Sequence, residues 1–582
     1  MRQNIYQELL LASVIEAYQK AFKQKLTEIF FEKPPQPKYG DIAIACFGYA
    51  QNLKIAPHLI AQSLANELNE LADKNSQFKA TALGAYINFK FPPKIIAKKI
   101  FTSFVAGEFN KVNLGGGQKI LIEFSAPNAN KPLHLGHGRN NAIGVFLVRL
   151  AKVLGFSVTA ANLVNDRGIH ICKSMLAYKI KGEGQTPETK KQKGDHFVGD
   201  YYVEFAKLAK EDPIEYNKQA QNLLLLWEQG DKGTIALWKK MTSWVLAGFE
   251  TTYRRSGVEF DHYYYESETY KGGKEIVLKA LEDGICYTES NGAVAIDLSE
   301  EGLGTKILLR GDKTSVYITQ DIYTTTKKFN DHKANMAFWV VGNEQEHHFK
   351  VLFAILRKLG YHWAKQCHHV SYGMINLPDG KMKSREGNTV DLDDLYNQMQ
   401  ESAYDLIKQR EFAEKREEHE LKEVADKVGQ AAINFFILKS ASTKDIVFNR
   451  KESLSFDGMT GPYLQYTFAR MTSLLEKANR SEIKIEDIDS DVDWSQEEVM
   501  LLRQGVFFVE TLQISWKDKN PGPVAHYAYD LCRLYNRFYY LYPIIKQKEV
   551  LLRENRINLT ILCRDILRQC LYLLNIEALD RM

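Results

Sequence analysis

A strand–loop–helix–strand unit near residue 120 constrains the fold of this chain more than any other feature. KILIEFS (119–125) is a continuous apolar and β-branched run of the kind that is buried in a parallel sheet. A loop with two prolines follows, then a helical pattern from about His137 to Val153, then a second strand, FSVTAANLV (156–164). This order is a βαβ unit, and it predicts an α/β protein with a doubly wound, Rossmann-type parallel sheet.

Two later apolar runs extend the predicted sheet. AFWVVG (337–342) and HHVSYGMIN (368–376) have the composition of buried strands. Between the two halves of the sheet, the chain is helical and rich in aromatic residues up to about 260, and short strands and turns follow at 285–320. We therefore predict that the sheet is split by insertions over about 175–310.

The segments on either side of the sheet have different patterns. Residues 1–32 predict a helix, and helical patterns around 42–52 and 57–73 precede a strand pair that ends in GAYINFKF (84–91). From 428 onward nearly every segment is helix-periodic, which predicts an all-α bundle. The predicted organisation is an α+β N-terminal add-on domain (1–112), a Rossmann-type domain with insertions (113–395), a helical connector (396–455) and an α-helical bundle (456–582).

Composition excludes several classes of protein. Apolar residues at 45% and charged residues at 25% are the average usage of a soluble globular protein, and no stretch approaches the ~20 apolar residues of a membrane span. The net charge of +4 is too small to identify a partner. Seven scattered cysteines without a CxxC pair predict reduced thiols in the cytoplasm, no disulfide framework and no structural zinc.

The segment EFSAPNANKPLHLGHGRNNAIG (123–144) carries the first chemical signal. It places His134 and His137 at the mouth of the predicted helix, where unpaired N–H groups bind phosphate and two imidazoles three residues apart share one side. Gly136 and Gly138 would let a flat base lie close to the backbone. The pair could also be half of a metal site, but no third ligand stands at a convincing spacing, so we predict none.

The second signal is LPDGKMKSREGNTVDLDDL (377–395), a glycine-flanked basic loop beyond the last predicted strand. It carries Lys381, Lys383 and Arg385. Alone it would be interpreted as an ordinary exposed loop. Its position on the same sheet as HLGH favours a functional loop instead.

These two segments resemble the HxGH and KMSKS signatures of class I aminoacyl-tRNA synthetases, and their surroundings resemble the arginyl-tRNA synthetase family. SAPNANKPLHLGH is similar to the family's S-x-P-N…P-x-H-x-G-H, TSVYITQDI (314–322) to its Y-x-T-x-D and VGNEQEHHF (341–349) to its G-x-x-Q-x-x-H-F. GPYLQYTFAR (461–470) and the ending ALDRM (578–582) resemble its anticodon-binding bundle. The likeness covers essentially the whole chain.

The resemblance implies an arginine–tRNA ligase that activates L-arginine with ATP and transfers it to the 3′-terminal adenosine of tRNA(Arg). It also implies Mg²⁺ bound with ATP and a need for tRNA during activation, and we expect a cytoplasmic monomer. Two alternatives stay open: another enzyme with an HxGH site, and an inactive RNA-binding paralogue. Two carboxylates, Glu123 and Asp321, favour arginine, because a guanidinium needs planar paired acceptors.

The resemblance also assigns roles to single residues by motif position. The implied ATP-binding residues are His134, Gly136, His137, His348, Lys381, Lys383 and Ser384, of which His134, His137 and Lys381 are catalytic together with Lys131. The implied arginine-binding residues are Glu123, Ser125, Asn128, Tyr317, Asp321 and Gln345. The implied tRNA-binding residues are Tyr86, Asn88, Tyr463, Tyr466, Tyr540 and Met582. Structural alternatives remain: Glu123 could be a strand-edge charge, and Asp321 could cap a helix that begins at 321–322.

One departure from the family pattern carries a further implication. KMKSR has Ser384 where KMSKS has its second lysine. In family members that vary there, a lysine just before HxGH substitutes for it, and Lys131 stands in that place.

Overall fold

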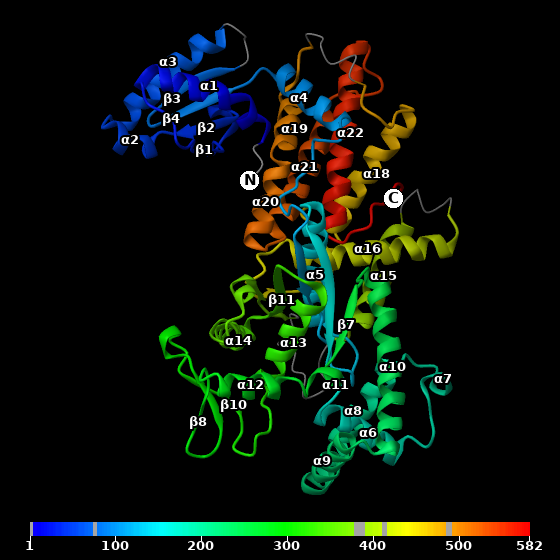
Figure 1. The fold of residues 1–582 in the computed structure, drawn as a ribbon. Helices are drawn as coiled ribbons and strands as arrows, with labels where there is room; N and C mark the ends of the chain where they lie inside the picture. Colours follow the sequence, from blue (N-terminus) through cyan, green and yellow to red (C-terminus); the bar gives the residue numbers. More distant parts are fainter. Residues whose placement is uncertain (1–3, 74–77, 377–389, 410–415, 485–491) are drawn as a thin grey trace.

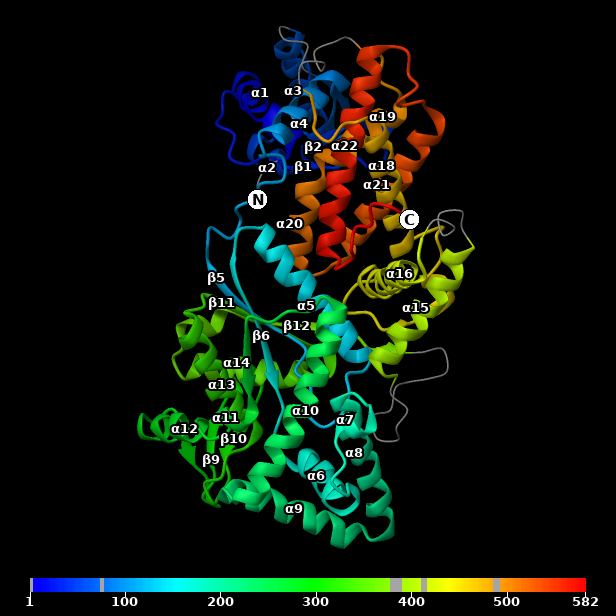
Figure 2. The same cartoon turned by 90° about the vertical axis from the view of Figure 1, so that its right-hand side faces the viewer.

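The computed structural model describes residues 4–73, 78–376, 390–409, 416–484 and 492–582. The molecule is elongated: the N-terminal domain and the C-terminal bundle lie side by side at one end, the central sheet lies in the middle, and inserted helices form the other end (Figures 1 and 2). The sheet is therefore held between two helical regions that come from different parts of the chain.

The central sheet has five parallel strands in the order β12-β11-β5-β6-β7. Its strands are β5 (Lys119–Glu123), β6 (Ser157–Val164), β7 (His262–Tyr265), β11 (Met336–Gly342) and β12 (Cys367–Tyr372). From β5 the chain adds β6 and β7 on one side, and it later adds β11 and β12 on the other side, so the order of connection switches between β5 and β11. Open α/β sheets bind ligands outside the carboxyl ends of the strands at such a point. The predicted doubly wound fold is confirmed.

Apolar residues on alternate sides of each strand fill two separate cores. On β5, Ile120 and Ile122 pack in the larger core, whereas Leu121 packs in the smaller one. Helix α5 (Leu135–Val153) covers the first face, and the other face is covered by α12 (Gly273–Glu282), α13 (Tyr317–His332) and α14 (Glu346–Lys358). Burial on both faces explains why the central strands β5 and β11 are almost continuously apolar.

Strand β7 lies inside the stretch 175–310, so that stretch contains two insertions separated by a strand of the sheet. The first insertion is helical: α6 (Ile169–Lys181), α7 (Pro187–Lys190), α8 (Gly194–Glu211), α9 (Pro213–Gln229) and α10 (Lys232–Ser256). The second contains α11 (Glu266–Thr269), α12 and an antiparallel sheet of β8 (Tyr287–Thr288), β9 (Val294–Asp297) and β10 (Thr305–Leu309). The sequence pattern did not predict β7, which has four residues and the polar sequence HYYY.

The N-terminal domain is α+β, as predicted, but two of its elements differ from the prediction. Its elements are α1 (Ile5–Phe22), β1 (Phe31–Glu32), β2 (Ile42–Ala45), α2 (Phe47–Leu53), α3 (Pro57–Asp73), β3 (Lys79–Leu83), β4 (Tyr86–Lys90) and α4 (Pro93–Val105). The first helix ends at Phe22, because Lys23 adopts a left-handed conformation. Residues 42–45 form a strand rather than a helix, because all four side chains are buried and the backbone pairs with β4.

The C-terminal half is helical, as predicted. The predicted boundary between 395 and 396 falls inside α15 (Leu392–Lys408), which is followed in the connector by α16 (Glu418–Leu438), β14 (Ile446–Val447) and α17 (Arg450–Ser453). The bundle contains α18 (Gly461–Lys477), α19 (Gln496–Val506), α20 (Phe508–Asp518), α21 (Gly522–Leu541) and α22 (Val550–Leu573). Residues 368–376 do not form one strand: after β12, β13 (Ile375–Asn376) leaves the sheet and pairs with β14.

The N-terminal domain contacts the bundle through an ion pair of 2.9 Å between Arg503 and Asp41.

All seven cysteines are buried and none is in a disulfide. Burial raises the pKa of several of these thiols, to about 12 for Cys46 and Cys172. In the described part of the chain, no helix has both the length and the apolar run needed to cross a bilayer.

Candidate active site

His134 and His137 cap the helix that follows the first strand of the sheet. His134 is the N-cap residue of α5, in an extended conformation, and its Nδ1 accepts a hydrogen bond of 3.1 Å from the backbone N–H of Gly136. Nδ1 of His137 in turn accepts a hydrogen bond of 3.1 Å from the backbone N–H of His134. The two rings lie 4.0 Å apart between centroids. The two histidines therefore satisfy the helix end and lie together, as predicted.

This capping arrangement fixes the proton on both imidazoles. An Nδ1 that accepts from a backbone N–H carries no proton, so each neutral ring has its proton on Nε2. Burial and the charge of Lys131 lower the pKa of His134 to about 4, and burial places the pKa of His137 well below its ordinary value. Both histidines are thus neutral at pH 7 and present an N–H donor on Nε2.

Lys131 lies beside this histidine pair. It is half-buried, its charge contributes to lowering the pKa of both histidines, and burial lowers its own pKa. Lys131 is thus near the histidine pair, and its contact with ATP stays a prediction.

Lys381, Lys383, Ser384 and Arg385 lie outside the described residues, but the residues on both sides of that stretch are attached to α5 and the turn before it. The N–H of Leu135 donates to the carbonyl of Val390, and the N–H of Leu392 donates to the carbonyl of Leu133, each at 3.0 Å. On the other side, the buried guanidinium of Arg139 donates to the carbonyl of Met374 at 2.7 Å.

Gly138 packs against the start of α15. A Cβ at this position would lie 2.9 Å from Cδ1 of Leu392, the end of a flexible side chain, so a larger residue would require that leucine to move. For Gly136 and Gly138, the close approach of a base stays a prediction.

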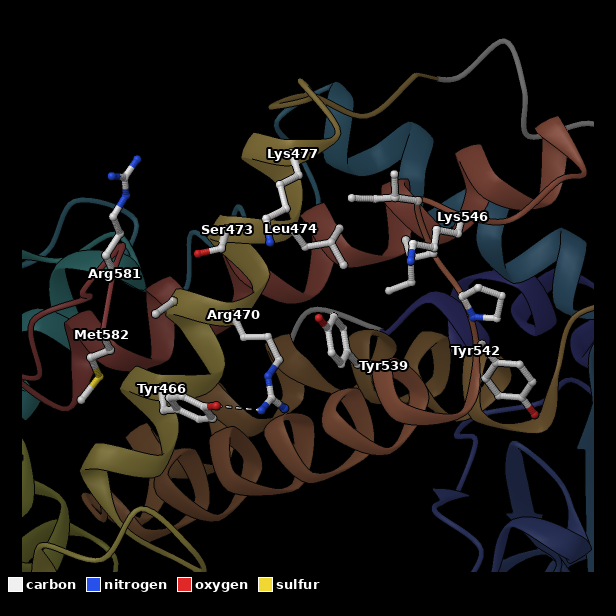
Figure 3. Close-up of a pocket in the computed structure, with 14 residues that line it drawn as sticks. Tyr466, Arg470, Ser473, Leu474, Lys477, Tyr539, Tyr542, Lys546, Arg581 and Met582 are labelled. Atoms are coloured by element: carbon white, nitrogen blue, oxygen red, sulfur yellow. Dashed lines mark hydrogen bonds between the residues drawn. The ribbon is translucent and has the colours of Figure 1, made fainter. Parts of the chain in front are cut away.

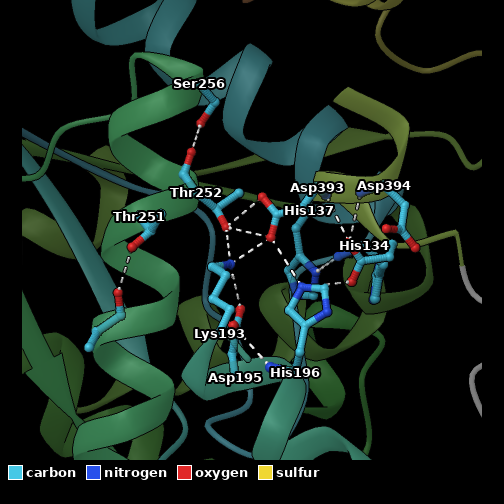
Figure 4. A network of polar contacts seen from close by, with 12 residues as sticks. His134, His137, Lys193, Asp195, His196, Thr251, Thr252, Ser256, Asp393 and Asp394 are labelled. Carbon is cyan, nitrogen blue, oxygen red and sulfur yellow. Dashed lines mark hydrogen bonds and ion pairs between the residues drawn. The ribbon is translucent and has the colours of Figure 1, made fainter. Parts of the chain in front are cut away.

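A polar network joins the first insertion to the start of α15 next to these histidines (Figure 4). Nζ of Lys193 donates to Asp195 at 2.9 Å, to Asp393 at 2.6 Å and to Thr252 at 2.5 Å. Nε2 of His196 lies 3.2 Å from Asp393. Burial alone would raise the pKa of Asp393, but hydrogen bonds from His196 and Lys193 lower it to about 2. Among the described residues, Asp195, His196 and Asp393 are close enough together to hold a metal ion, but the ammonium of Lys193 already binds both carboxylates.

The predicted arginine-binding residues of the first strand differ in accessibility. Glu123, at the carboxyl end of β5, is buried and forms an ion pair with the buried Lys328 of α13. The side chain of Ser125 is buried, whereas Asn128 is exposed at the edge of the sheet. Of these three residues, Asn128 is the one that a solute can reach directly.

The predicted residues of α13 and α14 meet at the same edge. Asp321 accepts a hydrogen bond of 2.7 Å from Nε2 of His348, and this bond raises the pKa of His348. Tyr317 is exposed at the first position of α13, and Gln345 is exposed just before α14. Because α13 begins at Tyr317, Asp321 lies inside the helix and is not its cap.

Glu266 is a functional candidate that the sequence pattern did not reveal. It directly follows β7, and burial raises its pKa to about 7, with Arg167 lowering it and Asp166 and Asp321 adding repulsion. The side chain is partly exposed. Its carboxylate also lies 3.9 Å from the guanidinium of Arg167. A carboxyl group whose pKa is displaced by burial beside other charged groups is a candidate for a functional role. Recognition of β7 as a strand would have revealed it.

The bundle contains a hollow of about 600 Å³ near the end of the chain (Figure 3). Two of the predicted tRNA-binding residues, Tyr466 and Met582, line it together with Arg470, Tyr539 and Lys546. The hydroxyl of Tyr466 accepts a hydrogen bond of 3.2 Å from Arg470. The other two lie outside it: Tyr463 accepts from Asn536, and Tyr540 is 88% exposed on the outer surface of α21.

On the N-terminal domain, the two predicted residues are neighbours on β4. The ring of Tyr86 packs edge-on against the exposed Phe47 at 5.6 Å. Asn88 is buried, so a base could not reach its side chain without a local change.

Comparison with known proteins covers the whole chain. Residues 100–450 match the family described as "tRNA synthetases class I (R), catalytic domain", residues 464–582 match "DALR anticodon binding domain", and residues 6–91 match "Arginyl tRNA synthetase N terminal domain". The chain is 42% identical over 562 residues to an arginine–tRNA ligase of Treponema denticola, covering 95% of each chain. It is 39% identical over 575 residues to that of Borrelia hermsii, covering 97% of each.

Two solved structures have the same fold. The arginyl-tRNA synthetase of Thermus thermophilus superposes with a TM-score of 0.82 at 24% identity, over 99% of this chain and 100% of that one. The arginyl-tRNA synthetase of Plasmodium falciparum superposes with a TM-score of 0.78 at 20% identity, over 100% of both.

Proposed function

The chain belongs to the arginyl-tRNA synthetase family, and from this premise we propose how its residues carry out the reaction. It is an arginine–tRNA ligase, which uses ATP to convert L-arginine to arginyl-adenylate and pyrophosphate and then transfers arginine to the 3′-terminal adenosine of tRNA(Arg). The observation that carries our residue assignment is that the capped histidine pair, Glu266 at the start of α11 and Asp321 of α13 all lie at the edge formed by the carboxyl ends of the strands.

Amino-acid-dependent exchange of pyrophosphate into ATP tests this function directly. We expect exchange with arginine and not with the other nineteen amino acids, and we expect it to require tRNA. Exchange with a different amino acid would identify another synthetase. No exchange in the presence of tRNA would favour an inactive RNA-binding paralogue.

In the activation step, the arginine carboxylate attacks the α-phosphate. We assign Nε2–H of His134 and His137 to the phosphate oxygens, where two neutral, fixed donors stabilise the negative charge that develops in the transition state. Lys131 and Lys381 supply the positive charge for the leaving pyrophosphate. Mg²⁺ would enter with ATP, held mainly by the phosphates, and would neutralise part of their charge.

For the amino acid, we assign Asp321 and Glu266 to the guanidinium, with Tyr317 and Gln345 beside them and Asn128 at the α-amino and carboxylate end. Charge-assisted pairs between a guanidinium and carboxylates are among the strongest hydrogen bonds in proteins. The roles of Glu123 and Ser125 in arginine binding stay predictions, since both side chains are buried and bonded to other side chains. The role of His348 in ATP binding also stays a prediction.

The raised pKa of Glu266 makes arginine binding depend on pH. A carboxyl group with a pKa of about 7 is ionised to roughly 90% at pH 8 and roughly 10% at pH 6. Only the ionised form pairs with a guanidinium, so the KM for arginine should rise about tenfold as the pH falls from 8 to 6. Steady-state pyrophosphate exchange at each pH measures this.

The matched variant is Glu266→Gln, which should have a high KM for arginine that is nearly the same at both pH values. If the KM for arginine of this variant still rises as the pH falls, the pH dependence belongs to the Asp321–His348 pair instead.

For tRNA, we propose that the hollow of the bundle receives the anticodon loop through Tyr466, Tyr539 and Met582, because unpaired bases stack on aromatic side chains between cations. Tyr463, Tyr540, Tyr86 and Asn88 stay predictions. We further propose that the protein works as a cytoplasmic monomer, with domains at 1–112, 113–395, 396–455 and 456–582.

Removal of Arg581 and Met582 should lower the rate of tRNA charging while the protein stays folded. Both residues line the hollow, and the last residues of a chain seldom contribute much stability. Aminoacylation at limiting tRNA and a thermal melt measure the two effects. Equal kcat/KM for tRNA in the shortened protein would show that the end of the chain makes no contact with tRNA.

A further inference from the structure

The turn that follows β5 contains two successive residues in a conformation that non-glycine residues avoid. Ser125 has φ of 75° and Ala126 has φ of 47°. In this left-handed region the Cβ crowds the neighbouring carbonyl oxygen, and two such residues in succession are unusual. Strain of this kind persists only where the surroundings enforce it, and it is concentrated at functional sites.

Two buried asparagines hold the backbone of this turn. The N–H of Ser125 donates to Oδ1 of Asn140 at 2.6 Å, and the N–H of Ala126 donates to Oδ1 of Asn162 at 3.1 Å. Asn140 comes from α5, one turn after His137, and its Nδ2 donates to the carbonyl of Val340 on β11 at 2.7 Å. The turn is thus attached to the helix and to the strands on both sides of β5.

Tyr253, from the first insertion, completes this arrangement. Its hydroxyl lies 2.7 Å from Oγ of Ser125 and accepts a hydrogen bond of 3.2 Å from Nδ2 of Asn162. Tyr253 is 2% exposed and Asn162 is fully buried, so water cannot replace these bonds. The tyrosine lies near the end of α10, more than 120 residues after the turn, and its ring is fixed against Phe260.

The strained turn determines where Asn128 lies. Directly after Ala126, the chain pairs with the end of β6: the N–H of Asn165 donates to the carbonyl of Pro127 at 3.0 Å, and the N–H of Ala129 donates to the carbonyl of Asn165 at 2.9 Å. Asn128 is exposed between these two bonds. If the turn relaxed toward ordinary backbone angles, this short pairing and the position of Asn128 would shift.

We propose that Tyr253 is a positioning residue for the amino-acid substrate: through Ser125 and Asn162 it maintains the strained turn that presents Asn128 to arginine. This rests on the proposed role of Asn128 in arginine binding. The histidine pair is held by separate bonds, between its Nδ1 atoms and the backbone of α5, so binding of ATP does not depend on the tyrosine hydroxyl.

The test is Tyr253→Phe, which removes one oxygen atom and keeps the ring. Two buried polar groups then lose a partner, so the KM for arginine should rise about tenfold, whereas the KM for ATP should change by less than about twofold. A purely structural defect would not separate the two KM values. The double variant Ser125→Ala with Tyr253→Phe should have a KM for arginine no higher than that of the more severe single variant, because both changes remove the same hydrogen bond.

Tyr178→Phe is the matched control. Tyr178 is a buried tyrosine of the same insertion whose hydroxyl donates to the carbonyl of Gln185 at 2.8 Å, and it should leave both KM values unchanged. Asn128→Ala tests the premise separately, since arginine-dependent exchange by the unaltered protein already tests the function. The proposal is overturned if Tyr253→Phe changes neither KM, or raises both equally, or if Asn128→Ala leaves the KM for arginine unchanged.

Discussion

Replacing His137 with asparagine should slow arginyl-adenylate formation by about 10²- to 10³-fold, the usual cost of losing one fixed donor to a developing oxyanion. The reason lies in how the ring is used. Nδ1 of His137 accepts the N–H of His134, and Nε2 carries the only proton. The amide oxygen of asparagine can take over the first bond, but its side chain is too short to replace the second.

The same substitution separates catalysis from stability. Because the cap is retained, the thermal midpoint should stay near that of the parent, and the whole effect should appear in the rate of pyrophosphate exchange. His137→Ala is the comparison, since it loses both bonds and should also lower the midpoint. A normal rate in His137→Asn would mean that the cap is the only role of this histidine.

Lys131→Ala should slow activation by about 10²-fold, the size expected when one charge contact in the transition state is lost. Lys131 lies close enough to both histidines to lower their pKa, and both rings are neutral. Imidazolium therefore supplies no positive charge at this helix start, whereas Lys131 does. Binding of arginine should hardly change, so kcat should fall while the KM for arginine stays constant.

A second change tests whether Lys131 replaces the missing lysine of the KMSKS signature. Ser384→Lys in the Lys131→Ala background should recover part of the lost rate. Full activity in Lys131→Ala alone would exclude the compensation and would make Lys383 or Arg385 the next candidate. Lys152→Ala, on the last turn of the same helix, is a control for the loss of one charge.

The parts of the fold that the sequence predicted are those with long, consistent patterns. Four strands of the central sheet were predicted from their apolar or β-branched runs, of which β5 and β11 are buried along most of their length, and α5 begins within two residues of its predicted start. Strand β7 could not be recognised, because HYYY has no apolar alternation and its partner β6 lies about 100 residues earlier in the chain, before the helical insertion. Glu266 was missed with it. Residues 42–45 were assigned to a helix because their partner, β4, lies more than 40 residues away.

In the candidate site, too, the features set by local sequence were predicted and those set by distant contacts were not. Motif spacing identified the histidine pair, Lys131 and the edge of the sheet, because local chain geometry brings them together. The tautomer of the histidines, the pairing of Glu123 with Lys328 and the burial of Ser125 depend on contacts between distant segments. No local pattern predicts the left-handed conformation of Ser125 and Ala126, since glycine is the residue that usually adopts it.

The burial of every cysteine gives the protein a set of internal reporters. Thiolates react with alkylating reagents, so a thiol that is sealed from solvent and held protonated reacts only when its surroundings open. Cys46 lies in the N-terminal domain, Cys286 and Cys367 in the smaller core of the catalytic region, and Cys532, Cys563 and Cys570 in the bundle. The order in which they become labelled, read by peptide mass, would show which part of the molecule opens first when it is warmed and which part tRNA holds closed.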